Sequence, residues 1–301
     1  MNKKNWILLG VLAVLALAAY AYKLIDKKIA DERTRVGNFA SVIDVAKLDR
    51  ISWEAGAKKM VLNRENKSWR IETDGQFYVQ PDLMDQVLGG LAQLASSSLA
   101  IVSLQPDNKV LFGLDGEAKL IKLSADGQDV LEFQLGRSDG VRSYLSQVGD
   151  DKSYASLADL SAWQVEDWFD KKIFDNNSEL WTSLTVDNKL KPKQSWSVKK
   201  VNQEWLAASA EKLAIEKLKP VLNAMSQLEA SALPKQSLVG TGLDKPSLVI
   251  KVASDNLSNA MLVGRAEGNN YYVKNAASEN IYLVDKGVIA LFDQSLRDFV
   301  K

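Results

Sequence analysis

An uninterrupted apolar run near the start of the chain is its strongest hydrophobic feature. Residues 6–22 read WILLGVLAVLALAAYAY and carry no charge, and lysines flank them on both sides. As a helix that rises about 1.5 Å per residue, the run would extend about 25 Å, close to the ~30 Å hydrocarbon core of a bilayer. The pattern predicts a transmembrane anchor at residues 1–22, followed by a charged stalk at residues 23–44.

Other interpretations of this run are open. Ala19-Tyr20-Ala21 resembles the site of a cleaved signal peptide, although the run is longer than the about 7–15 apolar residues usual there. A helix buried in a soluble domain is a third reading. More Lys and Arg follow the run than precede it, which would favour a cytoplasmic body. We expect the body outside instead, because Lys3 and Lys4 on a short tail are typical of a signal-anchor and long domains translocate largely regardless of charge.

Two later stretches repeat apolar residues at three- and four-residue spacing, which is the period of an amphipathic helix. Pro81-Asp82 precedes the first stretch and suits the start of a helix. The apolar positions are Met84, Val87, Leu88, Leu91 and Leu94 in the first stretch, and Leu218, Val221, Leu222, Met225 and Leu228 in the second. The pattern therefore predicts two helices with equivalent apolar faces.

Similar strand patterns surround both predicted helices. A strand with a central Trp precedes each helix, and Gly-Leu-Asp, an alternating strand and Gly-Arg follow it. The matching segments are 68–71 with 204–206, 113–115 with 242–244, 119–123 with 248–252, and 136–137 with 264–265. We predict an α+β fold of two tandem repeats, unit 1 at residues 45–176 and unit 2 at 179–301. Each should be an antiparallel sheet with its amphipathic helix packed on one face.

The second copy resembles a known bacterial family, catalogued as domain of unknown function 4340. The resemblance is carried by the order of a Trp-bearing hairpin, an amphipathic helix and a series of short motifs, which are Gly242, Leu243, Asp244 and Pro246, then Gly264-Arg265, residues 271–273 and residues 281–284. The similarity covers nearly everything after the predicted anchor. The first copy departs from the pattern, with Gly116 and Glu117 where the second has Lys245 and Pro246.

Membership in this family would imply one N-terminal membrane helix, one or more such repeats, and a place beside ABC-transporter components of the gliding-motility auxiliary type. It implies an accessory role that faces the envelope, and no agreed catalytic residues. The motif residues read as turns and core. We expect the Gly of Gly-Leu-Asp to adopt a positive φ and the Asp to cap a turn.

Composition narrows the possible chemistry. The chain has no His and no Cys, which excludes a Ser-His-Asp triad, a thiol nucleophile and the usual zinc sites. Its 38 Lys and Arg balance 38 Asp and Glu, and the two signs are interleaved, so no basic stripe suggests nucleic acid as a partner. We predict a protein without enzymatic activity, cofactor or metal.

The remaining motifs that resemble active sites have structural explanations. Ser209 to Lys212 reads S-x-x-K and Ser254-Asp255-Asn256 follows, as in penicillin-binding serine enzymes, but the third element, K-T-G, is missing. We expect Ser209 to be a helix N-cap and residues 254–256 to be a turn. Gly240-Thr241-Gly242 also reads as a turn, and the carboxylate groups lack the spacing of an EF-hand loop.

The tryptophans suggest where a partner could bind. Trp69 and Trp205 occupy equivalent places in the two copies and should face the core. Trp163 and Trp168 have no Trp counterpart, so we predict that they form surface anchors for a partner, together with Phe169 and Phe174.

The function predicted from the sequence is that of an accessory subunit in the bacterial inner membrane. It would bind an ABC-transporter permease or auxiliary subunit, with its body facing the periplasm or outside. An envelope module that binds a ligand such as a glycan is the alternative.

Overall fold

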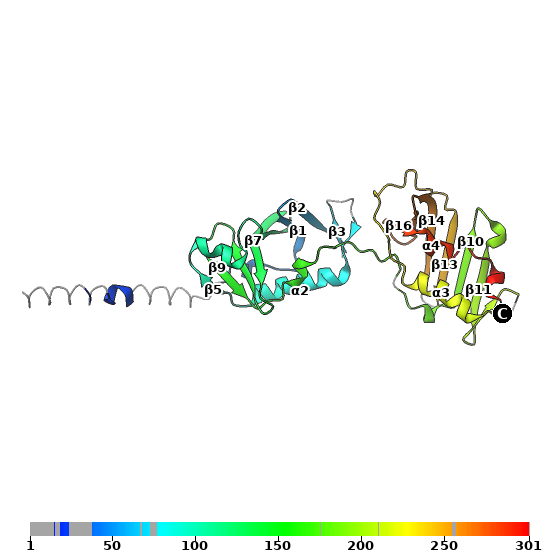
Figure 1. Ribbon diagram of the computed structural model, residues 1–301, viewed down its shortest axis with the longest axis horizontal. Coiled ribbons are helices and arrows are strands. Elements are labelled where there is room, and N and C mark those ends of the chain that lie inside the picture. Colours follow the sequence, from blue (N-terminus) through cyan, green and yellow to red (C-terminus); the bar gives the residue numbers. More distant parts are fainter. Residues whose placement is uncertain are drawn as a thin grey trace, which may run out of the picture. The chain divides into compact units, whose positions relative to one another are not determined.

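The computed structural model describes residues 15, 19–23, 38–66, 68–72, 77–174, 176–209, 211–254 and 257–300. The chain divides into two compact units (Figure 1). The first contains Met1–Thr73 and Pro81–Trp168, and the second contains Asp74–Gln80 and Phe169–Lys301. Two antiparallel sheets with a few helices confirm the predicted α+β class.

The first unit is built on an antiparallel sheet with strand order β3-β2-β1-β6-β7-β8-β9-β5. Its strands are β1 (Leu48–Ala55), β2 (Lys58–Glu65), β3 (Ser68–Ile71), β5 (Ala100–Ser103), β6 (Lys119–Ala125), β7 (Gln128–Ser138), β8 (Ser143–Gln147) and β9 (Ser153–Ser156). Its helices are α2 (Pro81–Ser96) and the 3-10 helices η1 (Phe39–Val42), η2 (Pro106–Phe112) and η3 (Ser161–Gln164).

The second unit has an antiparallel sheet with strand order β12-β11-β10-β13-β14-β15-β16. Its strands are β10 (Ser183–Asn188), β11 (Trp196–Val201), β12 (Glu204–Ala207), β13 (Leu248–Ser254), β14 (Leu257–Glu267), β15 (Asn270–Asn275) and β16 (Ile281–Asp285), and the segment with β4 (Phe77–Tyr78) belongs to this unit. Its helices are α3 (Ile215–Ser226), α4 (Lys286–Ala290), η4 (Ser178–Leu180), η5 (Pro192–Gln194) and η6 (Leu296–Phe299).

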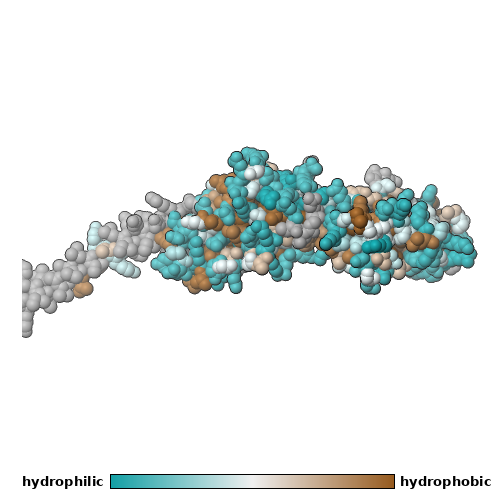
Figure 2. Space-filling view, turned by 90° about the horizontal axis from the view of Figure 1, so that it is seen from above, coloured by the Kyte–Doolittle hydropathy of each residue, from teal (hydrophilic) through white to brown (hydrophobic). Residues whose placement is uncertain are grey.

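Both predicted amphipathic helices are present, with small differences in their buried faces. In α2 the predicted Leu88 is only partly buried, while Leu83 and Gly90 join the buried face. In α3 the predicted residues from Leu218 to Met225 are buried and Ser226 joins them, but the helix ends at Ser226, so the buried Leu228 follows it. On the face shown in Figure 2, polar residues cover most of the surface and hydrophobic residues form small groups.

The two sheets share a buried row of apolar residues in the same register. In each sheet the row crosses four neighbouring strands, and every side chain in it is buried. The row contains Ile71, Leu62, Ile51 and Leu123 in the first sheet, and Ala207, Val198, Leu184 and Val252 in the second.

The Gly-Leu-Asp motifs form turns in both units. Gly113 and Gly242 have φ values of 64° and 72°, which confirms the expected positive φ. Asp115 caps its turn by accepting a hydrogen bond from the backbone N–H of Glu117 (3.4 Å). A Cβ atom added at Gly264 would lie 2.1 Å from the carbonyl oxygen of Thr241, so the Gly-Arg glycine is required by close backbone packing.

The short strand β4 and the segment that precedes η4 both pack with the second unit. Phe77 is 1% exposed, and its ring centroid lies 5.8 Å from that of Phe169 and 6.3 Å from that of Tyr282. The backbone N–H groups of Ile173 and Phe174 both donate to the carbonyl of Leu228, at 2.8 and 3.2 Å. The predicted boundary at residue 176 places these residues in the first repeat instead.

No helix among the described residues is long and apolar enough to cross a membrane. Of residues 1–37, which hold the predicted anchor and most of the predicted stalk, only 15 and 19–23 are described; the others lie outside the described residues. The anchor therefore stays a prediction.

Two adjacent glycines in α2 provide a matched test of its packing. A Cβ at Gly90 would lie 2.2 Å from the carbonyl oxygen of Asp159, whereas nothing lies within 4 Å of one at Gly89. We expect Gly90→Ala to destabilise the first unit by about 1–3 kcal/mol through overpacking, and Gly89→Ala to stabilise it by about 0.5–1 kcal/mol. Urea unfolding of both variants would measure this, and equal effects would contradict the packing described.

Candidate functional site

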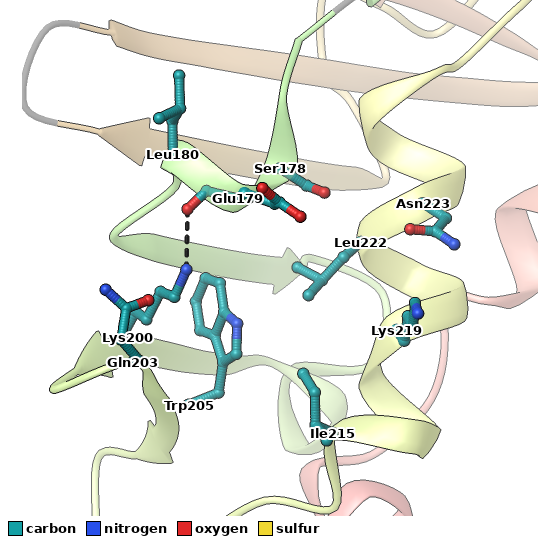
Figure 3. Close-up of a pocket in the computed structure, with 10 residues that line it drawn as sticks. All are labelled: Ser178, Glu179, Leu180, Lys200, Gln203, Trp205, Ile215, Lys219, Leu222 and Asn223. Carbon is teal, nitrogen blue, oxygen red and sulfur yellow. Dashed lines mark hydrogen bonds between the residues drawn. The ribbon is translucent and has the colours of Figure 1, made fainter.

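An open groove on the second unit is the best candidate for a functional site (Figure 3). It has a volume of about 630 Å³ and lies between η4, the β11–β12 hairpin and the helix α3. Its lining consists of Ser178, Glu179 and Leu180 from η4, Lys200, Gln203 and Trp205 from the hairpin, and Ile215, Lys219, Leu222 and Asn223 from α3.

Local sequence explains how the hairpin wall is built. Asn202 and Gln203 both have positive φ values, 48° and 68°, which suits a tight two-residue turn between β11 and β12. Alternation along β12 then turns Trp205 inward, opposite Lys200 on β11. The turn and the strand period together bring a lysine and a tryptophan to the same part of the groove.

The groove has an apolar floor and an apolar rim. Trp205 and Leu222 are each 6% exposed and form the floor, whereas Leu180 and Ile215 are 67% and 49% exposed at the rim. Figure 3 shows the nitrogen side of the Trp205 indole turned toward α3. The indole N–H has no hydrogen-bond partner among the residues that the structure describes, so it is available to a ligand.

Polar groups surround this floor. The Lys200 ammonium donates a hydrogen bond to the backbone carbonyl of Glu179 at 2.8 Å, which ties η4 to β11 (Figure 3). Asn177 caps η4 by accepting a hydrogen bond from the Glu179 N–H at 2.9 Å. Lys219 lies on the exposed face of α3 and forms no ion pair with any residue in the described part of the chain.

A second hollow of about 440 Å³ continues the groove along α3. It shares Ser178, Glu179 and Asn223 with the first and adds Asn176, Asn177, Ser226 and Gln227. The combined feature, which we call the α3 groove, therefore has an apolar stretch over Trp205 and an amide-rich stretch near the end of α3. Amide side chains both donate and accept hydrogen bonds, so this stretch suits a ligand that does the same.

The predicted surface anchors lie elsewhere and are not exposed. Trp163 and Trp168 are fully buried, Phe174 is 3% exposed, and Phe169 packs partly buried against the core of the second unit. The expectation of exposed anchors at these positions is therefore wrong. The chain around η3 folds back onto its own unit, so rings without a counterpart in the second half fill core space. None of the four residues lines the α3 groove.

The buried tryptophans of the first unit surround a lysine. The ring centroids of Trp163 and Trp168 are 5.8 Å apart, and Trp53 lies 6.3 Å from Trp168. The Lys119 ammonium lies 4.2 Å from the Trp53 ring centroid and donates to the Trp163 carbonyl. Burial lowers the pKa of Lys119, and the positive charge of Lys58 lowers it further. These contacts join β6 to η3, so packing within the first unit accounts for the position of Lys119.

The serine-lysine motif does not form a catalytic pair. Ser209 Oγ lies 2.9 Å from a carboxylate oxygen of Glu211, and the Lys212 ammonium lies 2.9 Å from a carboxylate oxygen of Glu204. The expected N-cap role of Ser209 is wrong, because α3 begins only at Ile215. Ser254 ends β13, while Asp255 and Asn256 lie outside the described residues.

No metal site is apparent in the described part of the chain, since no group of three or more acidic side chains is placed to share an ion there. The α3 groove is not predicted by the sequence pattern. Asn176 and Asn177 lie where the two predicted repeats meet, and Ile215 has the spacing of a core residue although it is half exposed. Neither the asparagines nor the isoleucine indicates a binding site without the tertiary structure.

A family profile matches residues 69–238, more than half of the chain, and its description is "Domain of unknown function (DUF4340)". This chain belongs to the DUF4340 family. The matched span contains every residue that lines the α3 groove. It also contains the Trp-bearing hairpin and the amphipathic helix of the family pattern, and it ends before the Gly242–Val284 motifs. No curated protein and no solved structure matches the chain.

Proposed function

We propose that this DUF4340 protein is a binding subunit without catalytic activity, and that the α3 groove holds part of its partner. The observation that carries the proposal is the apolar rim. Leu180 and Ile215 are exposed beside a floor of Trp205 and Leu222, so a partner that covers them would remove apolar surface from water.

The proposed setting is the bacterial inner membrane, with the body facing the periplasm or outside. The uncharged run at residues 6–22 supports an anchor. An ABC-transporter permease or auxiliary subunit is the proposed partner, as the resemblance to the family implies. We also propose that the two units are tandem repeats, which the equal strand orders from β3 to β9 and from β12 to β16 support.

Glycan binding is the second candidate function. The amide side chains at Asn176, Asn177, Asn223 and Gln227 favour it, because such groups match sugar hydroxyls. Trp205 weighs against it, since a ring that is 6% exposed offers little face for stacking on a sugar. Binding of a protein partner therefore agrees better with the groove as a whole.

Removing the apolar rim without changing its charge tests the proposed function. Leu180→Ser combined with Ile215→Ser should leave the fold intact, because both side chains are largely exposed. We expect partner binding to weaken by roughly tenfold or more, as for anchors that each contribute about 1 kcal/mol or more. Co-purification of the proposed partner, an ABC-transporter permease or auxiliary subunit, and the cellular phenotype would measure the loss.

Two control variants belong to this experiment. Leu190→Ser with Val239→Ser removes two exposed apolar side chains of the second unit outside the groove, and it should have no effect. Ser209→Ala with Lys212→Ala should also preserve function. Normal function of the groove variant, or loss of function in the serine-lysine variant at normal expression, would contradict the proposal.

A further inference from the structure

We propose that the occupant of the α3 groove is an extended, acidic peptide segment of the partner. This inference rests on the proposed function and names the chemistry of what is bound. Its basis is the charges and hydrogen-bonding groups that line the groove, and the continuation of one hollow into the next along α3.

Hydrogen-bond donors dominate the apolar stretch of the groove. The Lys219 ammonium forms no ion pair with a described residue, and the Trp205 indole N–H has no partner among them. Lys200 has one hydrogen bond, to the Glu179 carbonyl, which leaves two of its three N–H groups. Donors with positive charge, placed beside an apolar floor, are complementary to carboxylates that alternate with apolar side chains.

One carboxylate opposes this preference and sets the orientation of the ligand. Among the described lining residues only Glu179 is acidic, and it belongs to η4. Lys219 belongs to α3, which forms a different wall. An acidic side chain should therefore contact the α3 wall, where it avoids Glu179.

The amide-rich stretch favours a peptide over other anions. Asn176, Asn223 and Gln227 offer donors and acceptors together, which match the N–H and C=O groups of an extended backbone, and Asn177, whose amide oxygen caps η4, adds a donor. Inorganic phosphate and anionic headgroups mainly accept hydrogen bonds and would leave the amide oxygens unpaired. A neutral glycan would leave the charge of Lys219 without a partner.

A selection with random peptides tests this inference on the purified full chain. A phage-displayed random peptide library is selected on the wild-type protein, and the enriched peptides are synthesised and measured by fluorescence anisotropy. We expect acidic residues alternating with apolar ones. Lys219→Glu should weaken these peptides by roughly tenfold or more, because a hydrogen-bonded charge pair is lost and a repulsion replaces it.

Charge reversals distinguish this contact from general electrostatic attraction. Lys193→Glu makes the same change at an exposed lysine of the second unit outside the groove, and it should leave binding unchanged. A peptide in which Lys replaces one Glu should bind Lys219→Glu better than it binds the wild type. Phosphate, vesicles with phosphatidylglycerol and a neutral oligosaccharide should not compete.

Several results would overturn the inference. Enriched peptides that are neutral or basic, equal effects of the two charge reversals, or competition by the oligosaccharide or the vesicles would each exclude an acidic peptide. The same holds if no enriched peptide depends on Lys219. If Leu180→Ser with Ile215→Ser abolishes cellular function while the peptide selection fails, the proposed function stands and only this inference is lost.

Discussion

Phe77→Ala should destabilise the second unit by about 3–5 kcal/mol, the usual cost of removing a buried aromatic ring. Phe77 is 1% exposed and packs with Phe169 and Tyr282 in the core of that unit. Its position in the chain, between β3 and α2, would suggest that the first unit suffers instead. The variant therefore shows whether the stability effect follows the packing of Phe77, in the second unit, or its position in the chain, within the first.

Hydrogen exchange measured by mass spectrometry can follow each unit in the same sample. In Phe77→Ala, amides of β15 and β16 should lose protection while those of β6 and β7 keep it. Phe133→Ala is the reciprocal control, because Phe133 is fully buried in the first unit and should produce the opposite pattern. Loss of protection confined to the first unit in Phe77→Ala would contradict the structure.

Trp168→Ala should destabilise the first unit by about 3–5 kcal/mol. The ring is fully buried, lies against Trp163 and Trp53, and its indole N–H donates to the Val165 carbonyl at 2.8 Å. Truncation would leave a cavity and an unpaired carbonyl. The sequence interpretation of Trp168 as a surface anchor would have predicted loss of binding with an intact fold.

Denaturant unfolding combined with the partner assay decides between these results. Val165→Ala is a matched control, because the side chain is 39% exposed and its backbone carbonyl is kept; its effect should stay within about 0.5 kcal/mol. Trp168→Phe should recover part of the stability, since it refills much of the space. A Trp168→Ala protein that is as stable as the wild type would show that this ring is not a core residue.

Much of the fold could be predicted from the sequence because the relevant signals are local. The apolar spacing in α2 and α3 follows from the helix period, and the strand around Trp205 follows from alternation. Gly113 and Gly242 could be assigned a positive φ from their place in a turn motif. These features depend on neighbours in the chain, so they are readable without tertiary contacts.

The candidate site could not be predicted in this way. The α3 groove joins residues from η4, the β11–β12 hairpin and α3, which the chain brings together only by folding. Ile215 continues the apolar pattern of its helix, and only the packing of the unit shows that it is exposed. Which apolar residue of a helix stays exposed depends on the elements that pack over the others.

The sequence by itself determined the α+β class, the positions of the two amphipathic helices and the turn glycines, because periodicity and backbone sterics act over a few residues. The tertiary structure decided which unit holds Phe77, that Trp163 and Trp168 are buried, and why Gly90 and Gly264 tolerate no side chain. Each of these depends on atoms from distant parts of the chain that meet at van der Waals distance. Close packing of this kind leaves no periodic trace in the sequence.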